Sequence, residues 1–210
     1  RLQPMLQPGN HLDLVWRARL DEHMGTFQPE ALALNAARLI DSVPAIYALQ
    51  TLSAHLRLLP ERDPHSALYE ALIVVISLLD QPQLAAELIV RFELKLLNEL
   101  GYGLDLTACA ATGATEDLRY VSPKSGRAVS GAAGLPWHDK LFPLPACLEE
   151  GAAARAGTAA IEEAYRLSGF FLHRHVYEPR GIDEPPTRAA FLAALRKALV
   201  VPPLDDETAA

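Results

Sequence analysis

The chain has 210 residues, of which 50% are hydrophobic and 21% are charged, and it contains 16 prolines, 12 glycines and 2 cysteines. These proportions are typical of a globular protein and exclude a disordered chain or a disulfide scaffold. The net charge of −7 excludes a surface that is cationic all over, but it leaves room for a local basic patch. The apolar run 71–79 is too short to span a membrane, and two cysteines form no disulfide framework, so we expect a reducing cytosol.

The first 28 residues favour two β-strands. Residues 8–10 read Pro-Gly-Asn, a turn signal, and Leu12, Leu14 and Trp16 then recur with a period near two. A strand pair of this length cannot bury its apolar face alone. It needs either the following helices or further strands as a packing partner.

From Pro29 onward the apolar residues recur at helical spacing, and prolines punctuate the pattern. Pro29 suits a first helical turn, because its missing N–H has no intrahelical acceptor there. Four helices are predicted. The first starts at Pro29, and the second runs from about 45 to 59. The third starts behind an Asp63 cap with Pro64 in its first turn, and the fourth starts at Pro82. Gly101 stands where a left-handed residue is expected to end the last of these.

The helical period disappears between residues 106 and 145. Segments 118–122 and 127–130 flank the turn 123–126 and predict a small hairpin inside an insertion. Helical pattern returns at about 152–177, ends before Pro179, and resumes at 189–200 behind Thr187 as a cap. The predicted fold class is therefore mainly α with a small β part (α+β).

No catalytic arrangement stands out in the sequence. Cys109 and Cys147 lack a paired thiol or a neighbouring His, and helical carboxylates such as Glu93 stand near basic residues, which gives no sign of a desolvated acid. The turn 122–126 has a single glycine and lacks the spacing of a phosphate-binding loop. We therefore expect no enzyme, no cofactor and no metal.

His173 and His175 are the most conspicuous pair of possible metal ligands. On a helix, residues i and i+2 point about 200° apart, so their rings cannot chelate one metal as an i, i+4 pair can. A structural or partner-contact role is favoured, and a metal-dependent hydrolase is kept as a minor hypothesis. The stretch 155–197 carries seven Arg or Lys against five Asp or Glu, so a polyanion surface of the helical part is sought there first.

Arg91 and Lys95 lie one turn apart on a single helical face. Their apolar neighbours are Leu88, Phe92 and Leu96. A groove with an apolar floor and a basic rim suits an acidic peptide with an apolar end. The alternative is a pair of solvated basic side chains bound to Glu87 or Glu99, and spacing alone favours it.

Three segments of the chain resemble the bacterial RecO recombination mediators. They are RFELKLLNELGYGLD at 91–105 with Cys109 behind it, LQPG at 6–9, and YVSPKSG at 120–126. The resemblance covers nearly the whole chain. It implies four parts: residues 1–28 as a remnant of an OB-fold barrel, 29–105 as a helical bundle, 106–146 as a zinc-finger-like insertion, and 147–210 as C-terminal helices that pack on the bundle.

The resemblance also implies a function. RecO-like proteins are non-enzymatic DNA repair and recombination mediators of the RecF pathway, which bind single- and double-stranded DNA, anneal complementary strands and help load recombinase. Their partners are RecR and the acidic, Phe-ended C-terminal tail of single-stranded DNA-binding protein. The resemblance therefore implies a cytoplasmic, nucleoid-associated protein. Arg91 falls on the family's Arg-Phe-Glu-Leu motif where that tail docks, so the basic-rim interpretation now leads, with Lys95 added on geometry alone.

The sequence departs from this family at the DNA-binding barrel. RecO-like proteins begin with about five strands, whereas this sequence opens near the last of them. The basic residues left for a DNA surface are Arg1, Arg17 and Arg19, and Trp16 can stack on a base. The competing hypothesis is an acidic helical protein-interaction module that does not bind DNA itself.

A second departure concerns zinc. Some family members hold zinc with two Cys-x-x-Cys pairs, but here Cys109 is followed at the matching step by Thr112, and residues near Ser130 and Ala133 replace the later pair. Without these thiolates the insertion cannot hold zinc. Hydrogen bonds and packing around the hairpin are expected to stabilise it instead.

Overall fold

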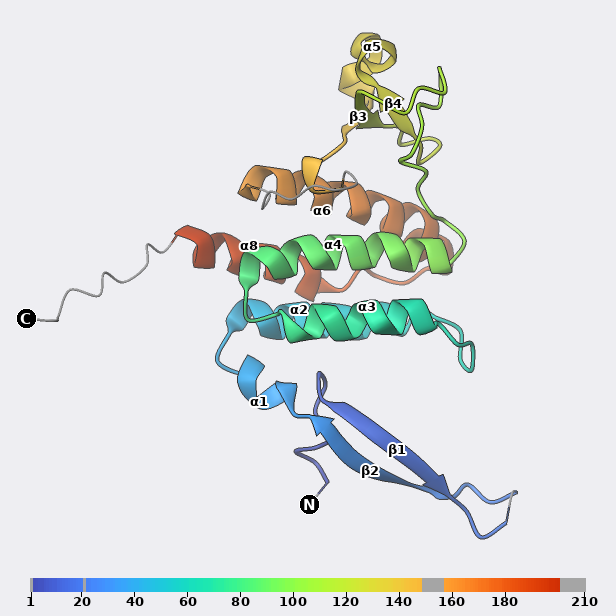
Figure 1. Ribbon diagram of the computed structural model, residues 1–210, viewed down its shortest axis with the longest axis vertical. Helices are drawn as coiled ribbons and strands as arrows, with labels where there is room; N and C mark the ends of the chain where they lie inside the picture. Colours follow the sequence, from blue (N-terminus) through green and yellow to red (C-terminus); the bar gives the residue numbers. More distant parts are fainter. Residues whose placement is uncertain (1, 21, 149–156, 201–210) are drawn as a thin grey trace, which may run out of the picture.

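A helical body separates two small β parts in the computed structural model, which describes residues 2–20, 22–148 and 157–200. A strand pair lies at one end of the long axis, and the insertion lies at the other end (Figure 1). The helical body contains α2 (Val43–Leu56), α3 (Ser66–Ser77), α4 (Pro82–Glu99), α6 (Thr158–Leu172) and α8 (Pro186–Val200). The expected α+β class is confirmed.

The strand pair consists of β1 (His11–Arg17) and β2 (Thr26–Ala33), which run antiparallel. The helix predicted to start at Pro29 is wrong, because Pro29 lies within β2 opposite Leu14. Proline is tolerated there, since the sheet has two strands and the missing N–H costs no ladder bond on a free edge. The strand pair thus reaches past the predicted boundary at residue 28, and only the short α1 (Asn35–Leu39) links it to the bundle.

Polar contacts hold the strand pair against the helices. The side-chain amide of Asn35 donates to the Gly9 carbonyl at 3.0 Å, and the backbone N–H of Ala36 donates to Asn10 Oδ1 at 2.9 Å. The His11 ring lies 2.9 Å from the Tyr69 hydroxyl on α3. These contacts fix the root of the hairpin, while its far end projects away from the body (Figure 1).

Two predicted boundaries of α4 are confirmed. The helix starts at Pro82, and Gly101 follows its end with a positive φ of 86°, where a side chain would be strained. The predicted start of α3 is wrong, because the helix begins at Ser66 and not behind an Asp63 cap. His65 holds the preceding position outside the helix, and its Nδ1 lies 2.8 Å from Glu99 Oε2.

The C-terminal part also differs from the prediction. A π-helical turn, η3 (His173–Tyr177), and α7 (Glu178–Arg180) carry α6 past Pro179, and Gly181 ends the stretch in a left-handed conformation. The widened turn interrupts the regular hydrogen-bond ladder directly before this proline. The predicted start near residue 152 lies outside the described residues. Thr187 is no cap either, because it lies inside α8 and its hydroxyl bonds to Thr51 at 3.0 Å.

The insertion contains the predicted hairpin, formed by β3 (Leu118–Val121) and β4 (Ala128–Ser130). A third strand, β5 (Phe142–Pro143), pairs with the other edge of β3 and was not predicted, since two residues carry no periodicity. The remaining short elements are α5 (Gly131–Gly134) and the 3₁₀ turns η1 (Leu135–Lys140) and η2 (Ala146–Leu148). Val121 is fully buried and joins the insertion to the main core.

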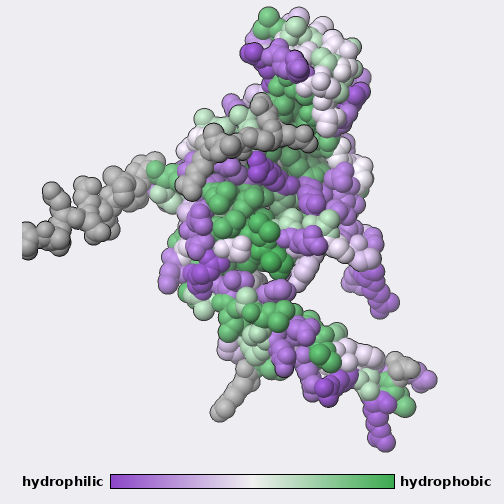
Figure 2. Space-filling view, in the orientation of Figure 1, coloured by the Kyte–Doolittle hydropathy of each residue, from purple (hydrophilic) through white to green (hydrophobic). Residues whose placement is uncertain are grey.

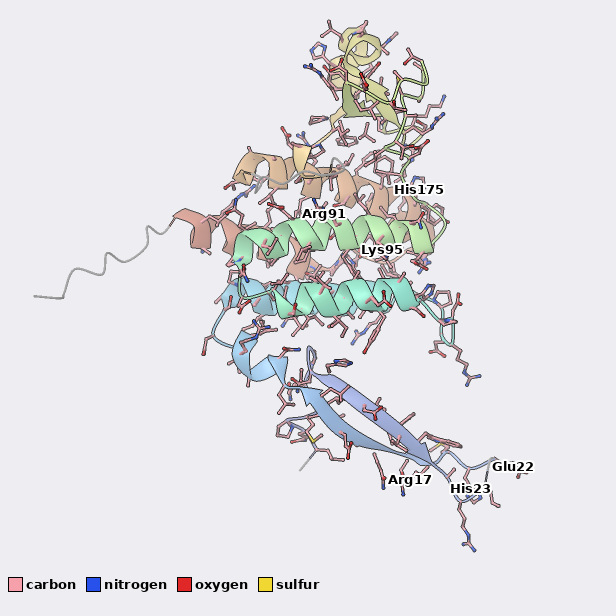
Figure 3. The ribbon with its side chains drawn as sticks, in the orientation of Figure 1. Arg17, Glu22, His23, Arg91, Lys95 and His175 are labelled. Atoms are coloured by element: carbon pink, nitrogen blue, oxygen red, sulfur yellow. The ribbon has the colours of Figure 1, made fainter. Side chains whose placement is uncertain are left out.

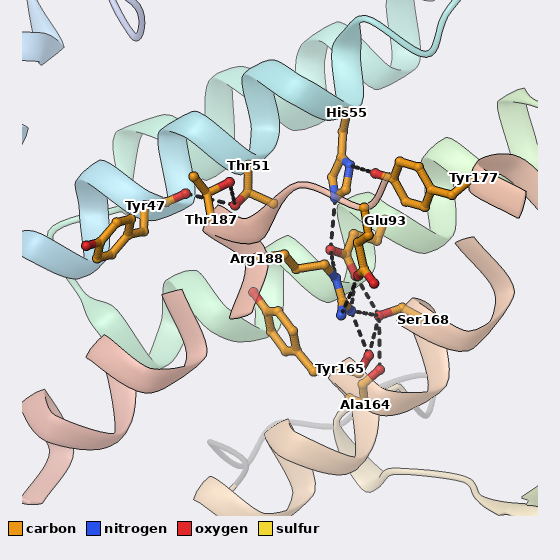
Figure 4. A network of polar contacts seen from close by, with 11 residues as sticks. Tyr47, Thr51, His55, Glu93, Ala164, Tyr165, Ser168, Tyr177, Thr187 and Arg188 are labelled. Carbon is orange, nitrogen blue, oxygen red and sulfur yellow. Dashed lines mark hydrogen bonds and ion pairs between the residues drawn. The ribbon is translucent and has the colours of Figure 1, made fainter. Parts of the chain in front are cut away.

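A buried ion pair lies at the centre of the helical body (Figure 4). Glu93 on α4 is 0% exposed, and both of its carboxylate oxygens accept hydrogen bonds from the Arg188 guanidinium on α8, at 2.8 and 2.9 Å. Ser168 on α6 donates to Glu93 Oε2 at 2.6 Å. Gly169 leaves room for the guanidinium, because a Cβ there would lie 2.6 Å from Arg188. The expectation that no carboxylate is desolvated is therefore wrong for Glu93.

His55 connects this pair to α2 and to the π turn. Its Nε2 lies 3.0 Å from Glu93 Oε1, and its Nδ1 lies 2.9 Å from the Tyr177 hydroxyl. A carboxylate only accepts, so Nε2–H donates to Glu93, while Nδ1 and the Tyr177 hydroxyl share the second hydrogen bond. The network therefore ties α2, α4, α6, η3 and α8 through a single carboxylate.

Burial alone would raise the pKa of Glu93 above its ordinary value of 4.5. The charge of Arg188 and the hydrogen bonds from His55 and Arg188 outweigh burial and hold this pKa well below that value. The carboxyl group is therefore ionised at neutral pH. Its charge is compensated by Arg188 and by hydrogen-bond donors rather than by solvent.

Glu93→Gln is expected to lower the free energy of unfolding by about 3–5 kcal/mol, because it leaves the buried Arg188 charge without its partner. Chemical denaturation at pH 7 measures this loss. The matched control is Glu162→Gln, which breaks the exposed pair between Glu162 and Arg196 and should cost no more than about 1 kcal/mol. Equal losses in the two variants would contradict the role assigned to Glu93.

Acidification should weaken the wild-type chain more steeply than Glu93→Gln. The folded-state pKa of Glu93 is depressed, so its contribution is complete above the ordinary value of 4.5 and is lost as the pH falls toward the folded pKa. Unfolding free energies of both chains, measured from pH 7 down to the lowest pH at which they fold, should converge as the pH falls. A constant difference over that range would contradict this assignment.

Candidate functional site

The tip of the strand pair gathers the residues expected to contact DNA. Trp16 lies opposite Phe27 and Arg17 opposite Thr26, at the end of the hairpin that points away from the helices (Figure 3). Trp16 is 45% exposed, and its indole N–H donates to the Met24 carbonyl at 3.2 Å. Arg19 is exposed in the loop that follows. Arg1 lies outside the described residues.

The two faces of the hairpin formed by β1 and β2 differ in polarity. One face carries the apolar pairs Leu14–Pro29 and Trp16–Phe27, and Leu14 and Phe27 are 51% and 61% exposed. On the other face Asp13 lies opposite Glu30, so two like charges meet at mid-hairpin. This acidic pair disfavours a polyanion at mid-hairpin, and a further exposed acid, Glu22, lies at the tip near His23 (Figure 3).

The structure changes the groove expected on α4. Phe92 is 1% exposed and belongs to the main core, so the prediction that it lines a surface groove is wrong, because its side of α4 packs on other helices. Leu88 is half-buried against the same core. Arg91 is exposed, and its Nη2 donates to the Cys147 carbonyl on η2 at 2.7 Å. Glu99 is bound to His65, not to Lys95.

Lys95 lies at the wall of a cavity between α4 and the insertion, with a volume of about 1020 Å³. Arg91 and Lys95 both project from α4 (Figure 3). The cavity's apolar lining residues are Leu94, Leu104, Leu106, Leu118, Leu144 and Leu148. Arg119, paired with Asp117, adds a second cation at the rim. Half of these leucines therefore come from the insertion, and no periodicity could reveal the apolar floor, because its leucines stand on separate segments.

Cys109 lies at the root of the insertion, beside residues that replace the expected thiols. Its Sγ accepts a hydrogen bond from the Ser130 backbone N–H at 3.3 Å. Hydrogen bonds from Ser130 and Thr112 lower the pKa of this thiol to about 6. A single thiol with two hydroxyl neighbours does not fit zinc, which needs four strong ligands. Within the described ranges, no three His, Cys, Asp or Glu side chains form a group that could hold a metal ion.

The two histidines of the minor hydrolase hypothesis do not converge. They lie in the π turn η3, where the His175 ring stacks between Tyr102 and Phe171 and His173 is exposed. Burial and the nearby Arg174 charge lower the pKa of His175. His175 therefore makes a packing contact and His173 lies on the surface, so the two rings are not arranged to bind one metal ion.

None of the described helices has the length and apolarity needed to cross a lipid bilayer.

Comparisons with known proteins place the chain in a family. Residues 44–181 match the family model described as "Recombination protein O C terminal". A protein named DNA repair protein RecO from Mesorhizobium japonicum is 66% identical over 93% of this chain and 77% of its own length. Proteins of the same name from Chelativorans sp. and Brucella abortus are 60% and 53% identical, each over 95% of this chain, and over 80% and 81% of their own lengths. The chain belongs to the RecO family of DNA repair proteins.

Proposed function

We propose that the chain is a non-enzymatic recombination mediator of the RecF pathway that works on bacterial nucleoid DNA in the cytoplasm. It binds single- and double-stranded DNA, promotes annealing of complementary strands, and helps load recombinase through RecR and single-stranded DNA-binding protein. The observation that carries this proposal is the exposed hairpin tip, which presents Trp16 on one face of the strand pair and Arg17 on the other, with Arg19 exposed in the loop that follows. An aromatic ring next to cations is the combination that binds single strands irrespective of sequence.

Charge at the tip determines how DNA is held. The cations neutralise phosphates, while Trp16 offers a ring face for a base. The Trp16 indole is already held by Met24 at 3.2 Å, so its orientation is fixed before DNA arrives. Annealing needs contacts that tolerate every sequence, and backbone charge with base stacking meets that need.

Arg17→Glu combined with Arg19→Glu should weaken binding of a fluorescent oligo-dT strand. The slope of log affinity against log salt should become shallower by about 1.4, since each lost phosphate contact removes about 0.7 on a single strand. Fluorescence anisotropy at several salt concentrations gives both quantities. The double variant Arg62→Glu with Lys197→Glu is the control, because it changes the net charge equally at exposed sites elsewhere. The same loss in both variants would contradict a contact at the tip.

The partner tail is assigned to the face of α4 that carries Arg91 and Lys95. The two cations attract the acidic residues of the tail, and the leucine-lined cavity beside Lys95 accommodates its terminal phenylalanine. Phe92 has no part in this contact, because it is buried. Leu88 supports α4 from within the core.

Arg91→Glu should lower the affinity for a synthetic acidic peptide that ends in Phe by at least tenfold, and Lys95→Glu should act in the same direction. The reason is that each change places a negative charge against a negative peptide. Calorimetric titration measures the affinity, and Lys197→Glu on α8 serves as the control. Thermal unfolding checks the fold, because Arg91 loses its bond to Cys147. An unchanged titration in both variants would remove this site.

The alternative is a protein-interaction module that reaches DNA only through its partners. The opposed pair Asp13–Glu30 and the net charge of −7 favour it. The two functions differ in the anisotropy experiment, since a pure interaction module binds the peptide but binds no oligonucleotide at any salt concentration.

A further inference from the structure

Three segments that are separate in sequence meet at one end of the helical body. They are the loop 100–104 after α4, the hairpin turn 122–126, and the π turn η3. Arg174 Nη1 in η3 donates to the Pro123 carbonyl at 2.8 Å. Gly126 packs on Phe171, and a Cβ at this position would lie 3.5 Å from the ring. The loop 100–104 joins them through Tyr102, whose ring stacks on His175.

The aromatic rings at this place form a stack that runs from the core to the surface. Phe171, which is buried, lies 6.0 Å from His175 with an interplanar angle of 9°, and His175 lies 5.0 Å from Tyr102 at 11°. Tyr102 is 42% exposed, and within the described residues no ring other than His175 stacks on it. The stack therefore ends at an aromatic ring in contact with solvent.

The backbone fixes Tyr102 in this position. Gly101 adopts a positive φ of 86°, and the backbone N–H of Tyr102 donates to the Leu97 carbonyl at 2.7 Å. The ring is thus presented by a helix end that is closed by its own hydrogen bonds. Little conformational entropy remains to be lost when a flat ligand stacks on it.

Cations lie among the exposed residues of the segments around Tyr102. Lys124, His173 and Arg174 are exposed, and Arg174 makes no ion pair with any described residue. Of the acids of the neighbouring segments, Asp105 pairs with Arg127 at 3.1 Å, and Glu99 lies 2.8 Å from the His65 ring. Glu178, four residues beyond Arg174, is the exposed acid on the same helical stretch. A partly exposed aromatic ring with two permanent cations on the neighbouring segments is complementary to a base and its phosphates.

We propose that Tyr102, Lys124, His173 and Arg174 form a second contact for single-stranded nucleic acid. A base extends the ring stack by lying on Tyr102, and Lys124 and Arg174 neutralise the adjacent phosphates. This inference rests on the proposed function, because it requires that the chain binds single-stranded nucleic acid. The surface lies at the end of the helical body that adjoins the insertion, whereas Arg17 lies on the strand pair on the other side of the helices (Figure 3). One chain can therefore hold two strands at once, as annealing requires.

The test is photo-cross-linking of the full chain to a single-stranded oligonucleotide that carries 5-iodouracil, with the modified residues identified by mass spectrometry. An adduct is expected on Tyr102 as well as at the hairpin tip. Adducts confined to the hairpin tip would overturn the second contact but leave the proposed function standing. If neither place gives an adduct and no oligonucleotide binds, both proposals fall.

Variants separate stacking from folding. In a chain that already carries Arg17→Glu and Arg19→Glu, Tyr102→Ala should lower the remaining oligonucleotide affinity about tenfold, whereas Tyr102→Phe keeps the ring and should change it less than twofold. Arg174→Glu should act like Tyr102→Ala. Lys197→Glu is the charge control. Unchanged affinity in both Tyr102→Ala and Arg174→Glu overturns the inference and leaves this surface to a protein partner.

Discussion

The ion pair between Glu93 and Arg188 is the constraint on which the arrangement of the helices depends. A buried pair of this kind adds little net stability over an apolar core, but it penalises every packing in which one charge loses its partner. Glu93 lies on α4, and its partners come from α2, α6 and α8, so a shift of any of these helices breaks a hydrogen bond to a buried carboxylate. Leucines alone would allow the helices to pack in several registers, whereas the hydrogen bonds of the Glu93 carboxylate form in only one register.

The candidate surfaces depend on that frame. The Arg91–Lys95 face is part of α4 itself, and the ring stack that ends at Tyr102 starts at Phe171, three residues beyond Ser168. The strand pair is held less firmly, because its root is fixed by Asn35 and His11 while its apolar face stays exposed. The helical centre thus connects the strand pair at one end of the molecule with the insertion at the other (Figure 1). Apolar residues also gather on the middle of one face, over α3 and α4 (Figure 2).

Local chemistry decided which parts of the fold could be predicted from sequence. The start of α4 at Pro82 and its end before Gly101 depend on the backbone preferences of single residues, and both predictions are confirmed. Pro29 has the same local signature as Pro82, yet it lies in an edge strand, because tertiary pairing with Leu14 overrides the local preference. The four-residue spacing of the α4 leucines could not say which side faces solvent, so Phe92 was assigned to the surface although it is in the core.

Long-range partners explain what the sequence could not show at the candidate site. Glu93 stands two residues from Lys95, but its true partners are 38, 75 and 95 residues away. The cavity beside Lys95 is completed by leucines of the insertion, and the motifs around Tyr102, Lys124 and His175 are separate in sequence but adjacent in space. The sequence could place Trp16 and Arg17 near one end of a strand pair, because both are part of the same short strand, but alternation along the strand puts them on opposite faces.

The central claim is that a helical frame presents surfaces for binding nucleic acid and partner proteins and carries out no chemistry of its own. The chain has 2 tryptophans, so Trp137→Phe leaves Trp16 as the sole indole reporter at the hairpin tip. Titration of this variant with oligo-dT should quench its fluorescence to a saturating level, and added salt should reverse the quenching. Fluorescence that stays constant at low salt up to saturating oligonucleotide would contradict the claim that this tip is where the chain meets DNA.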